Sequence, residues 1–131
     1  MRWLLAFLSA PNLLNGAIAL FAPQRWYTDF PFPGARWVEA FGSYNEHFIQ
    51  DIGAAYLAFG VLFAVAAVRL ERAWILASSL GFLVFAVPHL AIHLFVRAEL
   101  SMTGYVVTNL LLGIGVVVAL VTLSSTRSEE A

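Results

Sequence analysis

Residues 44–68 read YNEHFIQDIGAAYLAFGVLFAVAAV, and this stretch decides the fold. After Asp51 the chain runs to Arg69 without another charged side chain. Roughly 20 mostly apolar residues in a helix, rising about 1.5 Å each, are enough to cross the hydrocarbon core of a bilayer. The stretch therefore predicts a transmembrane helix that carries a histidine and an aspartate near its start.

Three further stretches have the same length and apolar character. They are residues 3–22, 73–96 and 104–123, and most charged residues of the chain fall between or beyond the four stretches. A chain of this length forms one domain. The sequence thus predicts an all-α fold, a four-helix transmembrane bundle made by residues 1–131 as a single membrane domain.

The composition supports a chain embedded in lipid and excludes several classes of protein. Hydrophobic residues make up 61% of the chain and charged residues 11%, against about 25% charged residues in a soluble domain. There is no lysine and the net charge is −1, so nucleic acid is not an expected partner. There is no cysteine, which excludes disulfides, thiolate metal sites and thiol catalysis.

The arginines predict the orientation in the membrane, because cytoplasmic loops carry an excess of positive residues. If the N-terminus is cytoplasmic, four arginines lie inside and three lie outside. The inside set is Arg2, Arg69, Arg72 and Arg127, and the outside set is Arg25, Arg36 and Arg97. We therefore expect both termini in the cytoplasm and the connection over residues 23–43 on the outer side.

That outer connection is rich in aromatic residues and contains Pro31 and Pro33, which argue against one continuous helix. Such an amphipathic segment is expected at the level of the lipid headgroups. Two interpretations stay open: a connector that lies on the membrane surface, and a lid that covers a site at the outer end of the bundle.

Ionisable side chains inside a span cost about 2.5–3.5 kcal/mol on insertion scales, and they are therefore candidates for function. Here they are concentrated in two spans, where they include the pairs His47 with Asp51 and His89 with His93. Each pair is spaced i,i+4, which places both members on one helix face. Since consecutive spans are antiparallel, both pairs are expected at matching depths in the outer half of the bilayer.

Three imidazoles and one carboxylate are a suitable ligand set for a divalent metal ion. We therefore expect His47, Asp51, His89 and His93 to converge and bind zinc, copper, iron or manganese. Outer-shell partners that orient these ligands are expected among the nearby amides. They are Asn15, Asn45, Gln50 and Asn109. The pattern identifies no catalytic residue, so whether the protein is an enzyme stays open.

Two alternatives do not require a metal ion bound by these four residues. The same polar residues can satisfy one another as an interhelical hydrogen-bond network, with Asp51 paired to His89, each bond contributing about 0.6 kcal/mol. A bis-histidine haem needs ligands on opposite sides of the iron and a cavity that is hard to form in a bundle of this size.

The function expected from the residues is metal binding, either for redox chemistry or as an accessory to a larger membrane enzyme. The alternative is a structural subunit of a membrane complex or homo-oligomer.

Small and hydroxyl side chains are expected to have structural roles. Gly53 and Gly60 lie on the face of their span roughly opposite His47, where they permit close packing against another helix. Ser9, Ser78 and Ser79 are expected to bond back to carbonyls of their own helices.

The chain resembles a group of small, uncharacterised four-helix bacterial membrane proteins of the broadly DoxX-like kind. The likeness is carried by Asn45-Glu46-His47-Phe48-Ile49-Gln50-Asp51-Ile52-Gly53 and by His89-Leu90-Ala91-Ile92-His93. The resemblance implies four helices and a bacterial inner membrane. It implies no activity.

Overall fold

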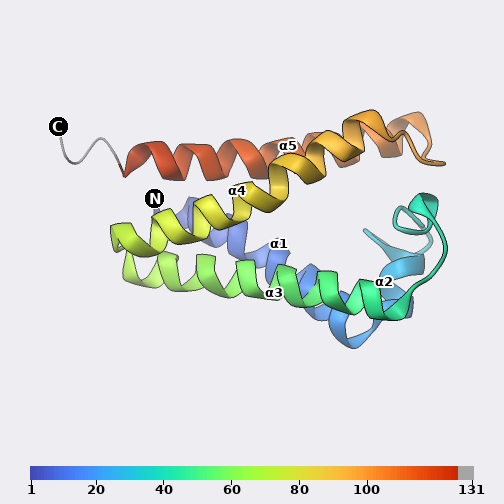
Figure 1. Cartoon of the computed structure of the whole chain (residues 1–131), viewed down its shortest axis with the longest axis horizontal. Coiled ribbons are helices and arrows are strands. Elements are labelled where there is room, and N and C mark those ends of the chain that lie inside the picture. The colour runs from blue at the N-terminus through green and yellow to red at the C-terminus, as the bar shows by residue number, and fades with distance from the viewer. Residues whose placement is uncertain (127–131) are drawn as a thin grey trace.

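The computed structural model describes residues 1–126, and all the regular secondary structure in this range is helical (Figure 1). Its four long helices are α1 (Arg2–Phe21), α3 (Glu46–Arg69), α4 (Arg72–Phe95) and α5 (Met102–Ser125). The short helix α2 (Pro23–Asp29) and the 3₁₀ helix η1 (Glu39–Phe41) lie in the connection between α1 and α3. The predicted all-α fold is confirmed, and the predicted spans end within three residues of these helices. Arg127, used in the orientation argument, lies outside the described residues.

All four long helices have the length and apolar composition of membrane spans. Their outward faces carry large apolar side chains that water would not favour. α5 shows this most clearly, because Leu110, Leu111 and Val117 are each more than half exposed. Lipid chains are the solvent that suits such a surface, so the chain is a multi-pass membrane protein.

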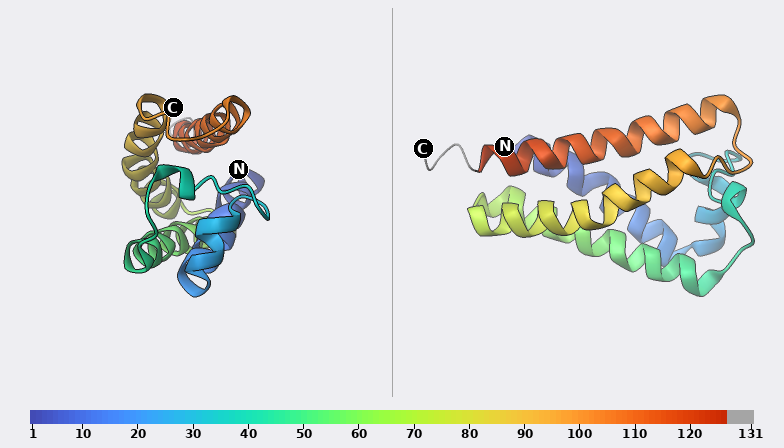
Figure 2. Two further views of the ribbon diagram at one scale, coloured as in Figure 1. Left: turned by 90° about the vertical axis from the view of Figure 1, so that its right-hand side faces the viewer. Right: turned by 45° about the horizontal axis from the view of Figure 1, so that its top comes forward.

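The helices run alternately up and down, so α1 begins and α5 ends at the same end of the bundle (Figure 1). The opposite end holds α2 and η1 and is called the loop end below. α4 lies close to α3 away from the loop end and diverges from it toward the loop end (Figure 2). This divergence decides where the polar pairs of the two helices lie.

The contact between α1 and α3 is the closest in the bundle, because glycines let the two backbones meet. A Cβ atom on Gly53 would lie 2.6 Å from the backbone nitrogen of Leu20, and one on Gly16 would lie 2.6 Å from that of Leu57. The hydroxyl of Ser9 donates across the contact to the carbonyl of Gly60 at 2.8 Å. The glycine face therefore packs against α1, and the prediction that Ser9 bonds to its own helix is wrong.

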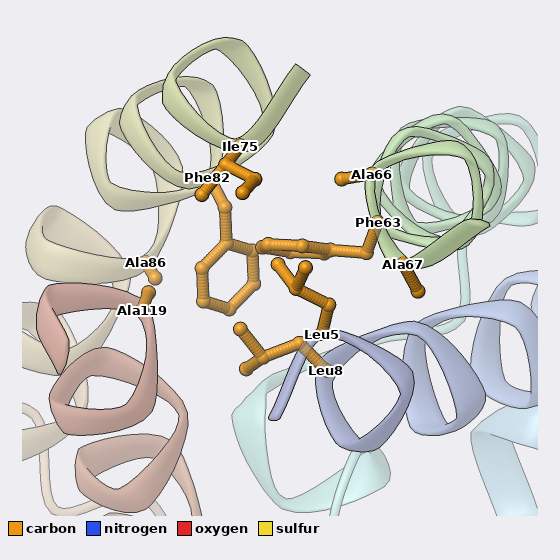
Figure 3. Close-up of a cluster of buried hydrophobic side chains, with 9 residues drawn as sticks. All are labelled: Leu5, Leu8, Phe63, Ala66, Ala67, Ile75, Phe82, Ala86 and Ala119. Atoms are coloured by element: carbon orange, nitrogen blue, oxygen red, sulfur yellow. The ribbon is translucent and has the colours of Figure 1, made fainter. Parts of the chain in front are cut away.

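Large side chains hold the bundle together away from the loop end. Side chains from all four long helices point toward one another there (Figure 3). Phe63 of α3 is fully buried, and its ring meets Phe82 of α4 at 5.4 Å between centroids. Nearby, the hydroxyls of Ser79 and Thr122 form a buried hydrogen bond of 2.9 Å between α4 and α5. The prediction that Ser79 bonds to its own helix is therefore also wrong, whereas Ser78 donates to a carbonyl of its own helix as predicted.

Candidate functional site

Two imidazoles lie in contact on the loop-end half of α4. The rings of His89 and His93 are 4.6 Å apart between centroids and inclined at 60°. Phe85 stacks on His89 at 5.2 Å, and Phe41 of η1 contacts the ring of His93 at 4.5 Å. Both histidines are partly buried, and within residues 1–126 neither imidazole forms a hydrogen bond. Their nitrogen lone pairs are therefore not engaged by the rest of the fold.

The polar pair of α3 lies in a different environment. His47 Nε2 is 3.5 Å from a carboxylate oxygen of Asp51, and the two side chains are 87% and 66% exposed. An exposed i,i+4 ion pair of this kind contributes about 0.3–0.5 kcal/mol when the histidine is protonated. The pair faces outward from the bundle, away from the core that joins α3 to α4.

The two pairs do not form the single four-residue centre expected from the sequence. Among the described residues no three His, Asp or Glu side chains are grouped so that they could hold one metal ion. The expected hydrogen bond between Asp51 and His89 is likewise not formed, because Asp51 pairs with His47 on its own helix. The metal-site and polar-network hypotheses both required the two pairs to converge. That prediction is therefore wrong in this structure.

The physical reason lies in the rotation of the helices about their own axes. The ring of Tyr56 packs on Phe85 of α4, so Tyr56 marks the face of α3 that meets α4. Asp51 precedes Tyr56 by five residues, which places it about 140° around the helix. His89 follows Phe85 by four residues and stays within about 40° of the contact face. One pair thus points inward and the other outward.

The depth of the two pairs does agree with the prediction. The ring contacts of Tyr56 with Phe85 and of Phe63 with Phe82 set the antiparallel register of α3 and α4. That register puts Asp51 within about one helical turn of His89 along the bundle. The two pairs therefore lie at matching depths, as predicted, although their side chains point in different directions.

The proposed outer-shell amides occupy different places. Asn45 caps α3, because its side-chain oxygen accepts a hydrogen bond from the backbone N–H of Phe48 at 3.1 Å. Asn15 donates to the carbonyl of Pro11 at 2.9 Å and lines a separate cleft. Gln50 is partly buried on α3 and forms no hydrogen bond within the described part of the chain.

Asn109 is the amide that lies at the level of the two histidines on α4. The hydroxyl of Tyr105 donates to the carbonyl of Leu94 at 3.0 Å, and the bond between Ser79 and Thr122 fixes the same register of α4 and α5. This register places Asn109 within about one turn of His89. The side-chain oxygen of Asn109 is buried and accepts no hydrogen bond, so it is an acceptor available to a neighbouring group.

The segment between α2 and α3 closes over the loop end of the bundle (Figure 2). The backbone N–H of Glu99 donates to the carbonyl of Ala40 at 3.3 Å, and the indole nitrogen of Trp37 lies beside Gly104 at the start of α5. With Phe41 on His93, these contacts tie the segment to both α4 and α5. The sequence left open whether this segment is a lid or a connector on the membrane surface. It did not single out Phe41 as a neighbour of the histidines, although the aromatic character of the segment was a signal for such a contact.

No family model, curated protein or solved structure matches this chain. The four apolar helices implied by the likeness to DoxX-like proteins are present, while membership of that group stays a prediction. The site must therefore be interpreted from its own chemistry.

Proposed function

We propose that this membrane protein binds a divalent transition-metal ion on α4, with the imidazoles of His89 and His93 as its two protein ligands. The supporting observation is the contact of the two rings, 4.6 Å apart between centroids, on one face of the helix. Two histidines at i,i+4 are a recurring way for a helix to bind zinc. Because no hydrogen bond occupies either imidazole within residues 1–126, coordination would break none.

The ligand set favours some of the expected metals over others. Imidazole suits zinc, copper and iron, whereas manganese prefers oxygen ligands. Two protein ligands leave coordination positions for water, a substrate or a group from another protein. An open position of this kind is compatible with redox chemistry or with a role as an accessory to a larger membrane enzyme.

Asn109 is suited to support such a centre from α5. A histidine that binds a metal through one nitrogen usually donates its other N–H to an oxygen, which fixes the orientation of the ring. The buried oxygen of Asn109 lacks a donor and lies at the depth of His89. Phe41 covers His93 and would limit the access of water to the site.

The same proposal includes the location of the protein. We place it in a bacterial inner membrane with both termini in the cytoplasm, which puts the histidine pair in the outer half of the bilayer. The start of α1 and the end of α5 lie at one end of the bundle (Figure 1), as this orientation requires. Trp3 is 85% exposed at that end, where an aromatic ring suits the interface between lipid and water.

A titration of the purified protein tests the proposal. The protein would carry a histidine-free affinity tag, would be stripped with a chelator in mild detergent, and would then be titrated with zinc and copper. We expect one ion per chain. His93→Ala should weaken binding by more than about 100-fold, because losing an outer-shell partner alone already costs 10–100-fold.

His47→Ala is the matched control, since it removes an imidazole from the neighbouring helix at a similar depth. It should leave the affinity unchanged. Wild-type protein that binds neither metal, or a His47→Ala variant that loses binding as His93→Ala does, would contradict the assignment.

A further inference from the structure

We infer that the loop end of α1 carries a second site, which binds the headgroup of a phospholipid containing both a phosphate and a primary ammonium group. The site is a cleft of about 310 Å³ between α1, α2 and the segment that follows α2. It shares no residue with the histidine pair and does not depend on the proposed metal function. Its walls combine apolar side chains with two opposite charges.

The charged side chains are Arg25 and Asp29, one turn apart on α2, and both line the cleft. They do not pair with each other, and no ion pair or hydrogen bond engages Arg25 within the described residues. One carboxylate oxygen of Asp29 accepts the backbone N–H of Gly34 at 3.2 Å, which leaves its second oxygen available. Side chains one turn apart on a helix are neighbours on its surface, so this cation and this carboxylate can meet the two opposite charges of one zwitterionic headgroup.

A third polar group also lacks a partner. Trp26 lines the same cleft and is only 8% exposed, yet its indole N–H is buried without an acceptor. An unsatisfied buried donor costs about 1–3 kcal/mol, and an indole N–H can only donate. The indole N–H of Trp26 has no accessible surface of its own, so it would reach a phosphate only if the ring turned toward the cleft. The exposed Arg25 can donate to a phosphate directly, through short and strong charge-assisted bonds.

The position of the cleft fits a lipid rather than a dissolved ion. α2 begins two residues after α1 ends, so the charges lie where the span leaves the hydrocarbon. Leu14, which is 63% exposed, and Ile18 continue the cleft along α1. The volume is near the lower end of that of ligand pockets and suits a headgroup, while the acyl chains would lie against α1 in the bilayer.

Asp29 determines which headgroup is preferred. A primary ammonium offers three N–H donors to the carboxylate, whereas the trimethylated ammonium of phosphatidylcholine offers none. Phosphatidylglycerol has the phosphate but no cation for Asp29. The expected order of binding is therefore phosphatidylethanolamine first, with phosphatidylcholine and phosphatidylglycerol behind it.

Native mass spectrometry of the full-length protein released from detergent, with each of the three lipids added in turn, tests this inference. We expect one retained phosphatidylethanolamine per chain, at about fivefold higher occupancy than phosphatidylcholine, the factor that one net hydrogen bond of about 1 kcal/mol supplies. Asp29→Asn should remove this preference, while Arg25→Gln should lower the retention of all three lipids. Arg36→Gln is the control, because Arg36 already pairs with Glu39 at 3.4 Å, and it should change nothing.

Three results would overturn the inference. The first is equal retention of all three lipids by the wild type. The second is an unchanged preference in Asp29→Asn. The third is displacement of the lipid by inorganic phosphate or glycerol phosphate at similar concentration, which would identify an anion site without a role for the lipid tail.

Discussion

Gly53→Ala is expected to destabilise the bundle by about 3 kcal/mol, at the upper end of the usual cost of overpacking. The added Cβ would lie 2.6 Å from the backbone nitrogen of Leu20 and 3.0 Å from the carbonyl carbon of Ala19. A flexible side chain could turn away from such a clash, but a helix backbone cannot. α1 would have to move away from α3, and the hydrogen bond from Ser9 to Gly60 would be lost with it.

Gly113→Ala is the matched control, because it makes the same chemical change where a new Cβ meets no atom within 4 Å. Alanine is favoured over glycine within a helix by about 0.8–1.0 kcal/mol, so this variant should be as stable as the wild type or more so. Unfolding of each protein by increasing sodium dodecyl sulfate in mixed micelles gives the comparison. Equal stability of the two variants would show that α1 and α3 do not pack through their glycines.

Phe63→Ala is expected to lower the free energy of unfolding by about 3 kcal/mol. The ring is fully buried where side chains from all four long helices meet (Figure 3). In a soluble protein this substitution costs about 3–5 kcal/mol. We expect the lower figure because lipid is as apolar as the ring, so the loss comes from packing and from the cavity rather than from exposure to water.

Phe48→Ala provides the comparison on the same helix, since Phe48 is 60% exposed. It removes the same ring from a position that faces outward and should change stability by less than about 0.5 kcal/mol. The same unfolding titration measures both variants. A larger loss in Phe48→Ala than in Phe63→Ala would mean that the buried cluster is not the core of the bundle.

The fold was predictable because the requirement of a bilayer leaves a strong signal in the sequence. An apolar run of about 20 residues bounded by charged residues is almost sufficient to identify a span. Accordingly, α3 ends at Arg69 and α4 begins at Arg72. The glycine face of α3 could also be recognised, because Gly53 and Gly60 share one side of the helix. Which helix it packs against was left open, since several helices could use the same close contact.

The candidate site was predictable in depth but not in direction. Counting residues along antiparallel helices places Asp51 and His89 at one level, and the observed register agrees. The direction of each side chain depends on which face of α3 meets α4, and that face is set by the rings of Tyr56 and Phe63. Because these rings bring α3 and α4 together away from the loop end, Asp51 is turned outward while His89 faces inward.

Side-chain hydrogen bonds between helices were the least predictable feature. A hydroxyl in a helix can always reach a carbonyl of its own previous turn, so sequence alone favours that partner for Ser9 and Ser79. The structure instead joins Ser9 to Gly60 and Ser79 to Thr122. These choices depend on the close approach of a second helix, which the spacing along one helix does not reveal.

Counting the imidazoles bound to Cu²⁺ by pulsed electron paramagnetic resonance tests the central claim most directly. If His89 and His93 are the metal ligands, the wild type and His47→Ala should both show two coordinated imidazoles, and His93→Ala should show at most one. Three imidazoles in the wild type, falling to two in His47→Ala, would contradict this account and would show that α3 and α4 close around a shared metal ion.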